Sequence, residues 1–220
     1  MLPQPGREDV CLSPLEPSDL SAKIGPFPAP DPAVTPAQAL TRNHFSTRWR
    51  ALRRPSRLAA PQPWRDWLQD RGSLTKRLTR ASHGQFSVQL VRLGYARPTR
   101  SEARALGMQP RRQALIREVQ LLGQGEPWVY ARSVIPIDTL SGPQRQLRGV
   151  GSRSLGTLLF SDLSMQREPL QIGRLRLQGS DPLWARRSVF RLANKPLLVC
   201  EVFLPALQHV EYPRFRGHNG

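Results

Sequence analysis

The apolar run at residues 197–204 constrains this chain most strongly, because it holds one carboxylate, Glu201, in its interior. An apolar run of this length after a turn predicts a β-strand with both faces buried. A carboxylate in such a strand loses its hydration, which costs several kcal/mol unless a neighbouring group compensates. Glu201 is therefore either half of a structural ion pair or a residue kept for function, and the strand alone leaves both interpretations open.

The pattern around this strand predicts an α+β fold. Residues 115–122 and 127–135 are two strands joined by Gly-Gln-Gly-Glu, which predicts a hairpin. Residues 187–192 are expected to form a second hairpin with the Glu201 strand through a loop at 193–196. We also expect strands at 86–93 and 170–177, and helical segments near Trp49, near Trp64, from residue 72 to 78 and over 144–160. Mostly antiparallel strands with inserted helices indicate a single α+β domain with an antiparallel sheet.

In the first hairpin, a loop of even length places two arginines opposite each other. Side chains alternate along strands, so Arg117 faces Arg132 within an otherwise apolar row. Such charges repel, and an anion between them would resolve the conflict, because arginine binds carboxylates through two parallel hydrogen bonds. The other interpretation is that Arg132 extends outward near the strand end. A loop of odd length would cancel the pairing.

The second hairpin, with a loop of four residues, places Glu201 opposite Ser188 and on one face with Val199 and Phe203. Apolar walls favour a protonated carboxyl, which could donate a proton, whereas a nearby arginine favours the charged form. The sequence does not say which of these effects is larger.

The formal net charge is +17, and almost all of the positive charge is arginine, because the lysines are only Lys23, Lys76 and Lys195. The arginines are spread along the chain, whereas a nucleic-acid site is expected to form a clustered stripe with exposed aromatic residues. The nearest cluster is the short segment 48–57. We therefore expect no nucleic-acid partner. A compositional bias toward arginine and the attraction of an anionic substrate both stay open.

The remaining composition indicates a cytoplasmic, metal-free protein, which we expect to be a monomer. No apolar run approaches the roughly 18 residues of a transmembrane helix, and the first residues lack the apolar core of a secretory signal. The histidines show no metal-ligand spacing with Cys11 or Cys200, which are themselves an improbable disulfide pair. Residues 1–43 are rich in proline and are expected to be a disordered extension, residues 44–206 the folded domain, and residues 207–220 a tail.

A series of short blocks between about residues 64 and 206 matches a known bacterial family in order and spacing. The blocks are LTKR at 74–77, REV at 117–119, GEPW at 125–128, TLSGP at 139–143, LG at 155–156, IG at 172–173, LWARRS at 183–188, and KPLL at 195–198 leading to EVFLPA at 201–206. No single block is specific. Together they resemble chorismate pyruvate-lyase, the enzyme that makes 4-hydroxybenzoate for ubiquinone biosynthesis.

The resemblance implies a compact antiparallel sheet with helical flaps over a buried pocket, no cofactor, chorismate as substrate, and 4-hydroxybenzoate and pyruvate as products. The family's substrate contacts fall on Leu74, Arg117, Leu155 and Glu201. Two departures occur: Leu74 stands where many relatives have methionine, and Ser154 precedes Leu155 where relatives often have proline. The change to leucine conserves volume, so we expect it to preserve binding.

These positions suggest a division of roles. We expect Arg117 to bind the ring carboxylate of chorismate and the two leucines to line the ring. Glu201, the expected catalytic residue, would hydrogen-bond the ring hydroxyl or protonate the leaving enolpyruvyl group. The candidates for binding the second carboxylate are Arg132, Lys76 and Arg77.

The competing interpretation is a small-molecule-sensing domain of a transcription regulator, because one group of bacterial regulators has effector domains of this fold. Those regulators place a winged helix-turn-helix before the domain. Here the preceding segment is rich in proline and lacks two well-formed amphipathic helices, which favours the enzyme.

Overall fold

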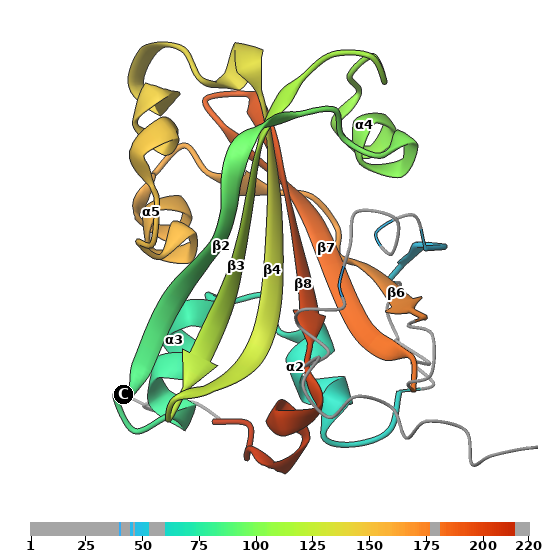
Figure 1. The fold of residues 1–220 in the computed structure, drawn as a ribbon, viewed down its shortest axis with the longest axis vertical. Coiled ribbons are helices and arrows are strands. Elements are labelled where there is room, and N and C mark those ends of the chain that lie inside the picture. Colours follow the sequence, from blue (N-terminus) through green and yellow to red (C-terminus); the bar gives the residue numbers. More distant parts are fainter. Residues whose placement is uncertain (1–39, 41–44, 46, 53–59, 177–180, 214–220) are drawn as a thin grey trace, which may run out of the picture. The chain divides into compact units, whose positions relative to one another are not determined.

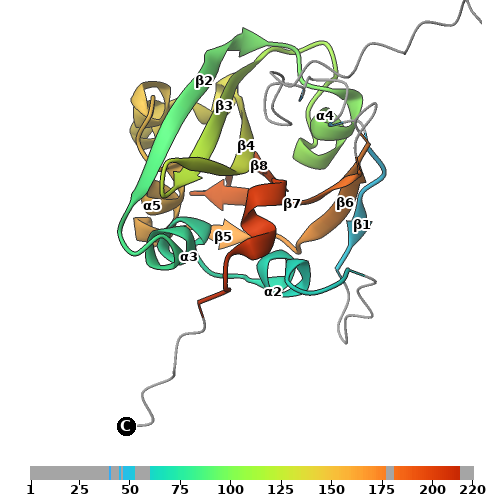
Figure 2. The ribbon, with the colours of Figure 1, turned by 60° about the horizontal axis from the view of Figure 1, so that its bottom comes forward.

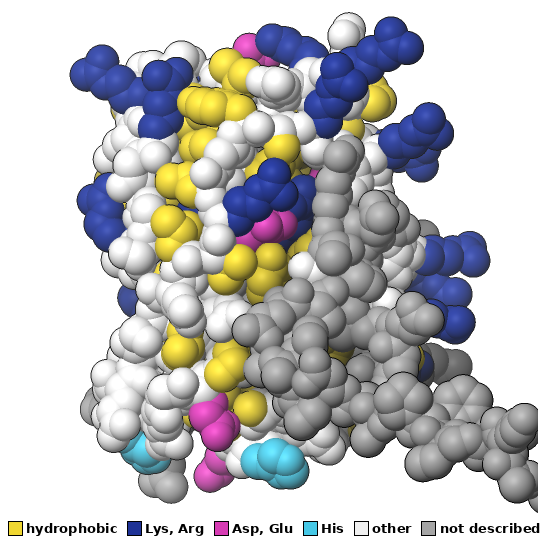
Figure 3. All heavy atoms as spheres, viewed as in Figure 1, with side chains coloured by type: hydrophobic (Ala, Val, Ile, Leu, Met, Phe, Trp, Pro, Cys, Tyr) yellow, Lys and Arg dark blue, Asp and Glu magenta, His cyan; other side chains and the backbone are white. Residues whose placement is uncertain are grey.

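The computed structural model describes residues 40, 45, 47–52, 60–176 and 181–213. Apart from Leu40, the expected extension at 1–43 lies outside the described residues, as do residues 53–57 of the arginine segment. Within the described part of the chain, no helix is long and apolar enough to cross a membrane. On the face shown in Figure 3, lysine and arginine side chains are scattered over the described surface and do not gather into one stripe.

An antiparallel sheet organises the fold, with the strand order β1-β6-β7-β8-β4-β3-β2 and with β5 paired to β7 (Figure 1). The strands are β1 (Arg50–Ala51), β2 (Phe86–Ala96), β3 (Ala114–Gly123), β4 (Glu126–Pro136), β5 (Gln166–Arg167), β6 (Gln171–Leu175), β7 (Leu183–Leu192) and β8 (Lys195–Phe203). The expected α+β class is confirmed, whereas β1 replaces the helical segment expected near Trp49.

Different helices cover the two faces of the sheet, because side chains alternate between these faces along each strand. On one face, Leu115 and Leu197 pack with α5 (Leu155–Ser161). On the other face, Ile116 and Leu198 pack with α4 (Arg100–Leu106). The helices α2 (Trp64–Gln69) and α3 (Leu74–Ala81) lie at the end of the sheet that is opposite to α4 (Figures 1 and 2). The 3₁₀ helices are η2 (Ile137–Thr139), η3 (Gly142–Gly149) and η4 (Pro205–His209).

Local sequence signals explain where three helices begin. The hydroxyls of Ser73 and Ser154 each accept a hydrogen bond from the backbone N–H three residues later, at the starts of α3 and α5. Thr99 and Glu102 form a capping box at the start of α4, which ends at Gly107 in the left-handed conformation. We did not expect α4 from its apolar pattern, although the capping box is visible in the sequence.

The first hairpin contains a β-bulge directly after its turn. The turn itself has even length, since residues 124–125 connect β3 and β4. The register then shifts between Leu121 and Leu122. At the same end of the hairpin, Gly123 lies against the ring of Trp128, where an added Cβ would be 2.2 Å from a ring carbon. A bulge adds one residue to one strand, so every later side chain on that strand changes its partner.

The bulge overturns the expected opposition of two arginines. Arg117 pairs with Ser133, and Arg132 pairs with Glu118. Arg117 and Arg132 therefore lie on opposite faces of the sheet, and the expectation that they share an apolar row is wrong.

The second hairpin has a shorter turn than expected. Residues 193–194 alone connect β7 and β8, so Glu201 pairs with Arg186 and the expected pairing with Ser188 is wrong. The shift in register is two residues, which leaves each side chain on its expected face. Glu201 therefore still shares a face with Val199, but an arginine stands beside it.

The domain continues past residue 206, where we expected a tail to begin. Leu207 is fully buried in the core, and the ring of Tyr212 meets the ring of Trp67 edge-on with centroids 5.0 Å apart. Residues 207–213, the described part of the expected tail, are therefore part of the folded domain.

Candidate active site

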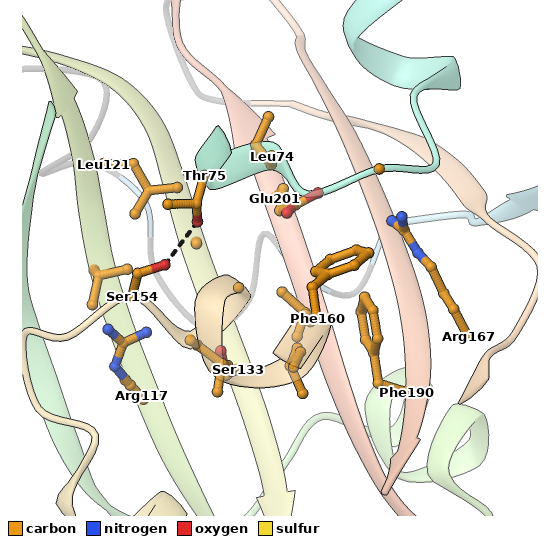
Figure 4. Close-up of a pocket in the computed structure, with 17 residues that line it drawn as sticks. Leu74, Thr75, Arg117, Leu121, Ser133, Ser154, Phe160, Arg167, Phe190 and Glu201 are labelled. Carbon is orange, nitrogen blue, oxygen red and sulfur yellow. Dashed lines mark hydrogen bonds between the residues drawn. The ribbon is translucent and has the colours of Figure 1, made fainter. Parts of the chain in front are cut away.

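A pocket lies between one face of the sheet and the helices α3 and α5 (Figure 4). The four positions onto which the family contacts fall, Leu74, Arg117, Leu155 and Glu201, all line it. The other lining residues are Gly72, Thr75, Val119, Leu121, Ala131, Ser133, Ser154, Gly156, Leu159, Phe160, Arg167, Phe190 and Val199. The lining is thus largely apolar, with charged side chains at a few positions.

Strand pairing arranges two rows of residues across β3, β4, β8 and β7, and the first three residues of each row line the pocket. The first row consists of Arg117, Ser133, Val199 and Ser188, and the second of Val119, Ala131, Glu201 and Arg186. Neighbouring strands are about 4.8 Å apart, so the first and last residues of a row are roughly 14 Å apart. Arg117 therefore lies at one side of the pocket, and Glu201 lies one row along and two strands away.

Arg117 is a buried cation that has no acidic partner. This residue of β3 is only 2% exposed. Its Nε donates to the carbonyl of Gly151 at 2.8 Å, and its Nη2 donates to the carbonyl of Arg153 at 2.7 Å. No carboxylate in the described part of the chain pairs with it. Burial lowers the pKa of Arg117 to about 10, which leaves the group protonated at neutral pH. A cation held only by neutral oxygens can pair with an external anion.

Glu201 forms the structural ion pair that the sequence left open, and it lines the pocket as well. Arg186, which is fully buried, donates from Nε to Glu201 Oε2 at 2.5 Å. Arg186 Nη1 also donates to the carbonyls of Trp67 and Asp70, at 2.7 and 2.6 Å. The other carboxylate oxygen, Oε1, accepts no hydrogen bond from the described residues, so it is available to a ligand.

Leu74 and Leu155 are the first residues of α3 and α5, and both are buried. Through these two residues the starts of both helices line the pocket. The helices are joined by a hydrogen bond of 2.8 Å between Thr75 Oγ1 and Ser154 Oγ (Figure 4). At Gly156, an added Cβ would lie 2.7 Å from Thr75 Oγ1. Glycine at this position therefore permits the close approach of α3 and α5.

Arg167, on β5, lines the pocket, and sequence reasoning missed it. Its Nε donates to Ser188 Oγ at 3.2 Å, and its Nη1 donates to the carbonyl of Arg71 at 2.8 Å. The guanidinium also lies over the ring of Phe190, 5.0 Å from the centroid. Burial, with the nearby charge of Arg186, lowers the pKa of Arg167 to about 10. The strand β5 has only two residues, so no periodic pattern in the sequence could have placed this side chain.

The three arginine and lysine candidates for a second carboxylate lie elsewhere. On the opposite face, Arg132 pairs with Glu118 and with Glu102, the latter through Nε to Oε1 at 2.7 Å. Arg77 pairs with Asp70 at 3.2 Å, and Lys76 is exposed on α3. None of the three is among the pocket-lining residues, and the expected position of Arg132 beside Arg117 is wrong because of the bulge.

Residues 49–211 match the family model described as chorismate lyase. The chain belongs to this family. A probable chorismate pyruvate-lyase of Marinobacter nauticus is 43% identical over 146 residues, which cover 66% of this chain and 78% of that protein. The chorismate pyruvate-lyase of Erwinia tasmaniensis is 41% identical over 141 residues, which cover 64% of this chain and 78% of that protein.

Among solved structures, a transcriptional regulator of the GntR family from Bacillus cereus is similar over 60% of this chain and 99% of its own, with a TM-score of 0.45 and 12% identity. A likeness of this degree does not bear on the function of the chain.

Proposed function

We propose that this protein is a chorismate pyruvate-lyase that converts chorismate into 4-hydroxybenzoate and pyruvate, the first committed step of ubiquinone biosynthesis, in the cytoplasm and without a cofactor. The observation that supports this most directly is the pocket itself. A buried arginine without an acidic partner, Arg117, stands across an apolar space from the carboxylate of Glu201. Family membership supports the same activity.

The proposed binding mode follows the shape of the substrate. The ring carboxylate and the ring hydroxyl of chorismate lie at opposite ends of the ring. Arg117 binds the carboxylate, and Glu201 Oε1 accepts a hydrogen bond from the hydroxyl. Leu74 and Leu155 pack against the ring between these two groups, and burial of the apolar ring atoms adds to affinity.

The reaction breaks the bond between a ring carbon and the enolpyruvyl oxygen. The electron pair of that bond leaves with the oxygen, and a proton leaves the ring carbon that bears the hydroxyl. The ring becomes aromatic, and the released enol of pyruvate isomerises to pyruvate. Because aromatisation makes the reaction strongly downhill, the protein mainly needs to position the substrate.

Two roles for Glu201 are compatible with this reaction. General acid catalysis of the leaving group would typically contribute about 10²–10⁴-fold. We favour hydrogen bonding to the ring hydroxyl, because Oε2 already accepts a hydrogen bond from Arg186 and only Oε1 has no donor among the described residues.

The test is incubation of the purified full chain with chorismate, with both products followed by chromatography. We expect 4-hydroxybenzoate and pyruvate in equal amounts. Arg117→Ala should weaken 4-hydroxybenzoate binding by about 2–5 kcal/mol, the range for truncating one partner of a buried charge pair. Tight binding of 4-hydroxybenzoate without turnover would instead indicate a small-molecule sensor, and the absence of both would refute the proposal.

A further inference from the structure

Arg117 and Arg167 are matched groups on opposite sides of the pocket. Arg117 stands at the β3 end of the first row, and Arg167 is hydrogen-bonded to Ser188 at the β7 end of the same row. Figure 4 shows the two guanidiniums on opposite sides, with that of Arg167 on the side of Glu201. Arg117 and Ser188 are roughly 14 Å apart along the row, and Ser133 and Val199, which lie between them, line the pocket.

Each guanidinium has the same kind of partners. Both use two nitrogens to donate to neutral oxygens, and in the described part of the chain neither forms an ion pair. The third nitrogen, Nη1 of Arg117 or Nη2 of Arg167, has no acceptor among the described residues. Stacking on Phe190 further restricts Arg167, so its charge is held in a defined position.

The charges around the pocket match a dianion. Glu201 is compensated by Arg186, with which it forms a salt bridge. Arg117 and Arg167 then contribute two positive charges that form no salt bridge with a carboxylate of the described residues. Buried cations of this kind are costly unless a ligand supplies the anions. A ligand with one carboxylate would leave one of the two uncompensated.

We propose that Arg167 binds the enolpyruvyl carboxylate of chorismate, an inference that rests on the proposed function. The enolpyruvyl ether is attached to the ring carbon next to the one that bears the hydroxyl. If Glu201 holds that hydroxyl, the second carboxylate must lie at the Glu201 side of the pocket, where Arg167 is. Arg117, at the other side, remains with the ring carboxylate.

The proposal predicts different effects of Arg167 on the binding of substrate and of product. Chorismate has two carboxylates, whereas 4-hydroxybenzoate retains only the one assigned to Arg117. Removal of the Arg167 charge should therefore weaken chorismate binding and leave 4-hydroxybenzoate binding unchanged. Removal of the Arg117 charge should weaken the binding of both. A purely structural role for Arg167, through Arg71 and Phe190, would affect both ligands.

The experiment compares Arg167→Gln, Arg167→Lys and Arg117→Gln with wild type in the full chain. The matched control is Arg174→Gln, which removes an exposed arginine of β6 outside the pocket. Initial rates give kcat and KM for chorismate, and calorimetric titration gives the Kd of 4-hydroxybenzoate.

For Arg167→Gln we expect kcat/KM for chorismate to fall about 30-fold or more, the lower bound for losing a buried charge contact. The Kd of 4-hydroxybenzoate should be unchanged, which also demonstrates that the variant is folded. Arg167→Lys should recover part of the loss because it keeps the charge.

Two outcomes for Arg167→Gln would overturn the inference: a kcat/KM for chorismate equal to wild type, or an affinity for 4-hydroxybenzoate that falls by the same factor as kcat/KM for chorismate. Failure of the wild-type protein to convert chorismate would refute the proposed function itself, which makes the two failures distinguishable.

Discussion

Replacement of Arg186 by methionine should destabilise the protein strongly. The side chain is fully buried, and its loss leaves the carboxylate of Glu201 without a partner in a site that is only 15% exposed. Removing one member of a buried pair typically costs about 3–5 kcal/mol. The carbonyls of Trp67 and Asp70 also lose their donor, which moves the expected cost toward the upper end of that range.

A second ion pair, whose arginine is also on β7, provides the control for this stability loss. Arg191 on β7 donates to Glu168 at 2.9 Å, but both side chains are more than a third exposed. Solvent screens such a pair, and its contribution is about 0–1 kcal/mol. Arg191→Met therefore removes an arginine from the same strand with a much smaller expected effect.

Urea denaturation of Arg186→Met and Arg191→Met measures both free energies of unfolding. For a domain of this size, about 3–5 kcal/mol corresponds to a decrease in Tm of roughly 6–20 °C. The double variant Arg186→Met, Glu201→Leu should be more stable than Arg186→Met alone, because no unpaired charge stays buried. If Arg186→Met costs no more than Arg191→Met, the reasoning about the buried pair is wrong.

Two further predictions concern the pocket and its cover. Glu201→Gln should reduce kcat less than about tenfold in a single-turnover assay if Glu201 only hydrogen-bonds the ring hydroxyl; a fall of about 10²–10⁴-fold would instead indicate proton donation. Gly156→Ala should force α3 and α5 apart, since the new Cβ would lie 2.7 Å from Thr75 Oγ1, and overpacking of this kind costs about 1–3 kcal/mol. Stopped-flow measurement should then show faster release of 4-hydroxybenzoate than from Gly149→Ala, whose new Cβ meets nothing within 4 Å; equal rates would contradict the role of the helix contact.

Local signals in the sequence were sufficient for the main elements of the fold. Turn residues at 123–126 predicted the first hairpin, and the break at 193–196 predicted the second. The strands of both hairpins could be predicted because side-chain alternation and turn preferences depend on only a few neighbouring residues. The apolar run around Glu201 likewise indicated a buried strand, and the face on which Glu201 lies was predicted correctly.

Register was the point at which local reasoning failed. The bulge between Leu121 and Leu122 changes which residues face each other, and it lies at the end of the hairpin where Trp128 packs over Gly123. One residue of slip moved Arg132 to the other face, where acidic residues from β3 and α4 neutralise it. The sequence between the strands contains no signal for this contact.

The sequence by itself determined that this chain forms an antiparallel α+β domain with a carboxylate in a buried strand, and its ordered blocks indicated the family. Only the tertiary structure decided which charge meets which: Glu201 with Arg186, Arg132 with two glutamates, and Arg117 and Arg167 with no acid in the described residues. The physical reason is the separation in sequence of the residues that interact. Turns and alternation are set by neighbours in sequence, whereas the neutralisation of a buried charge depends on groups that only strand pairing and helix packing bring within a few ångströms.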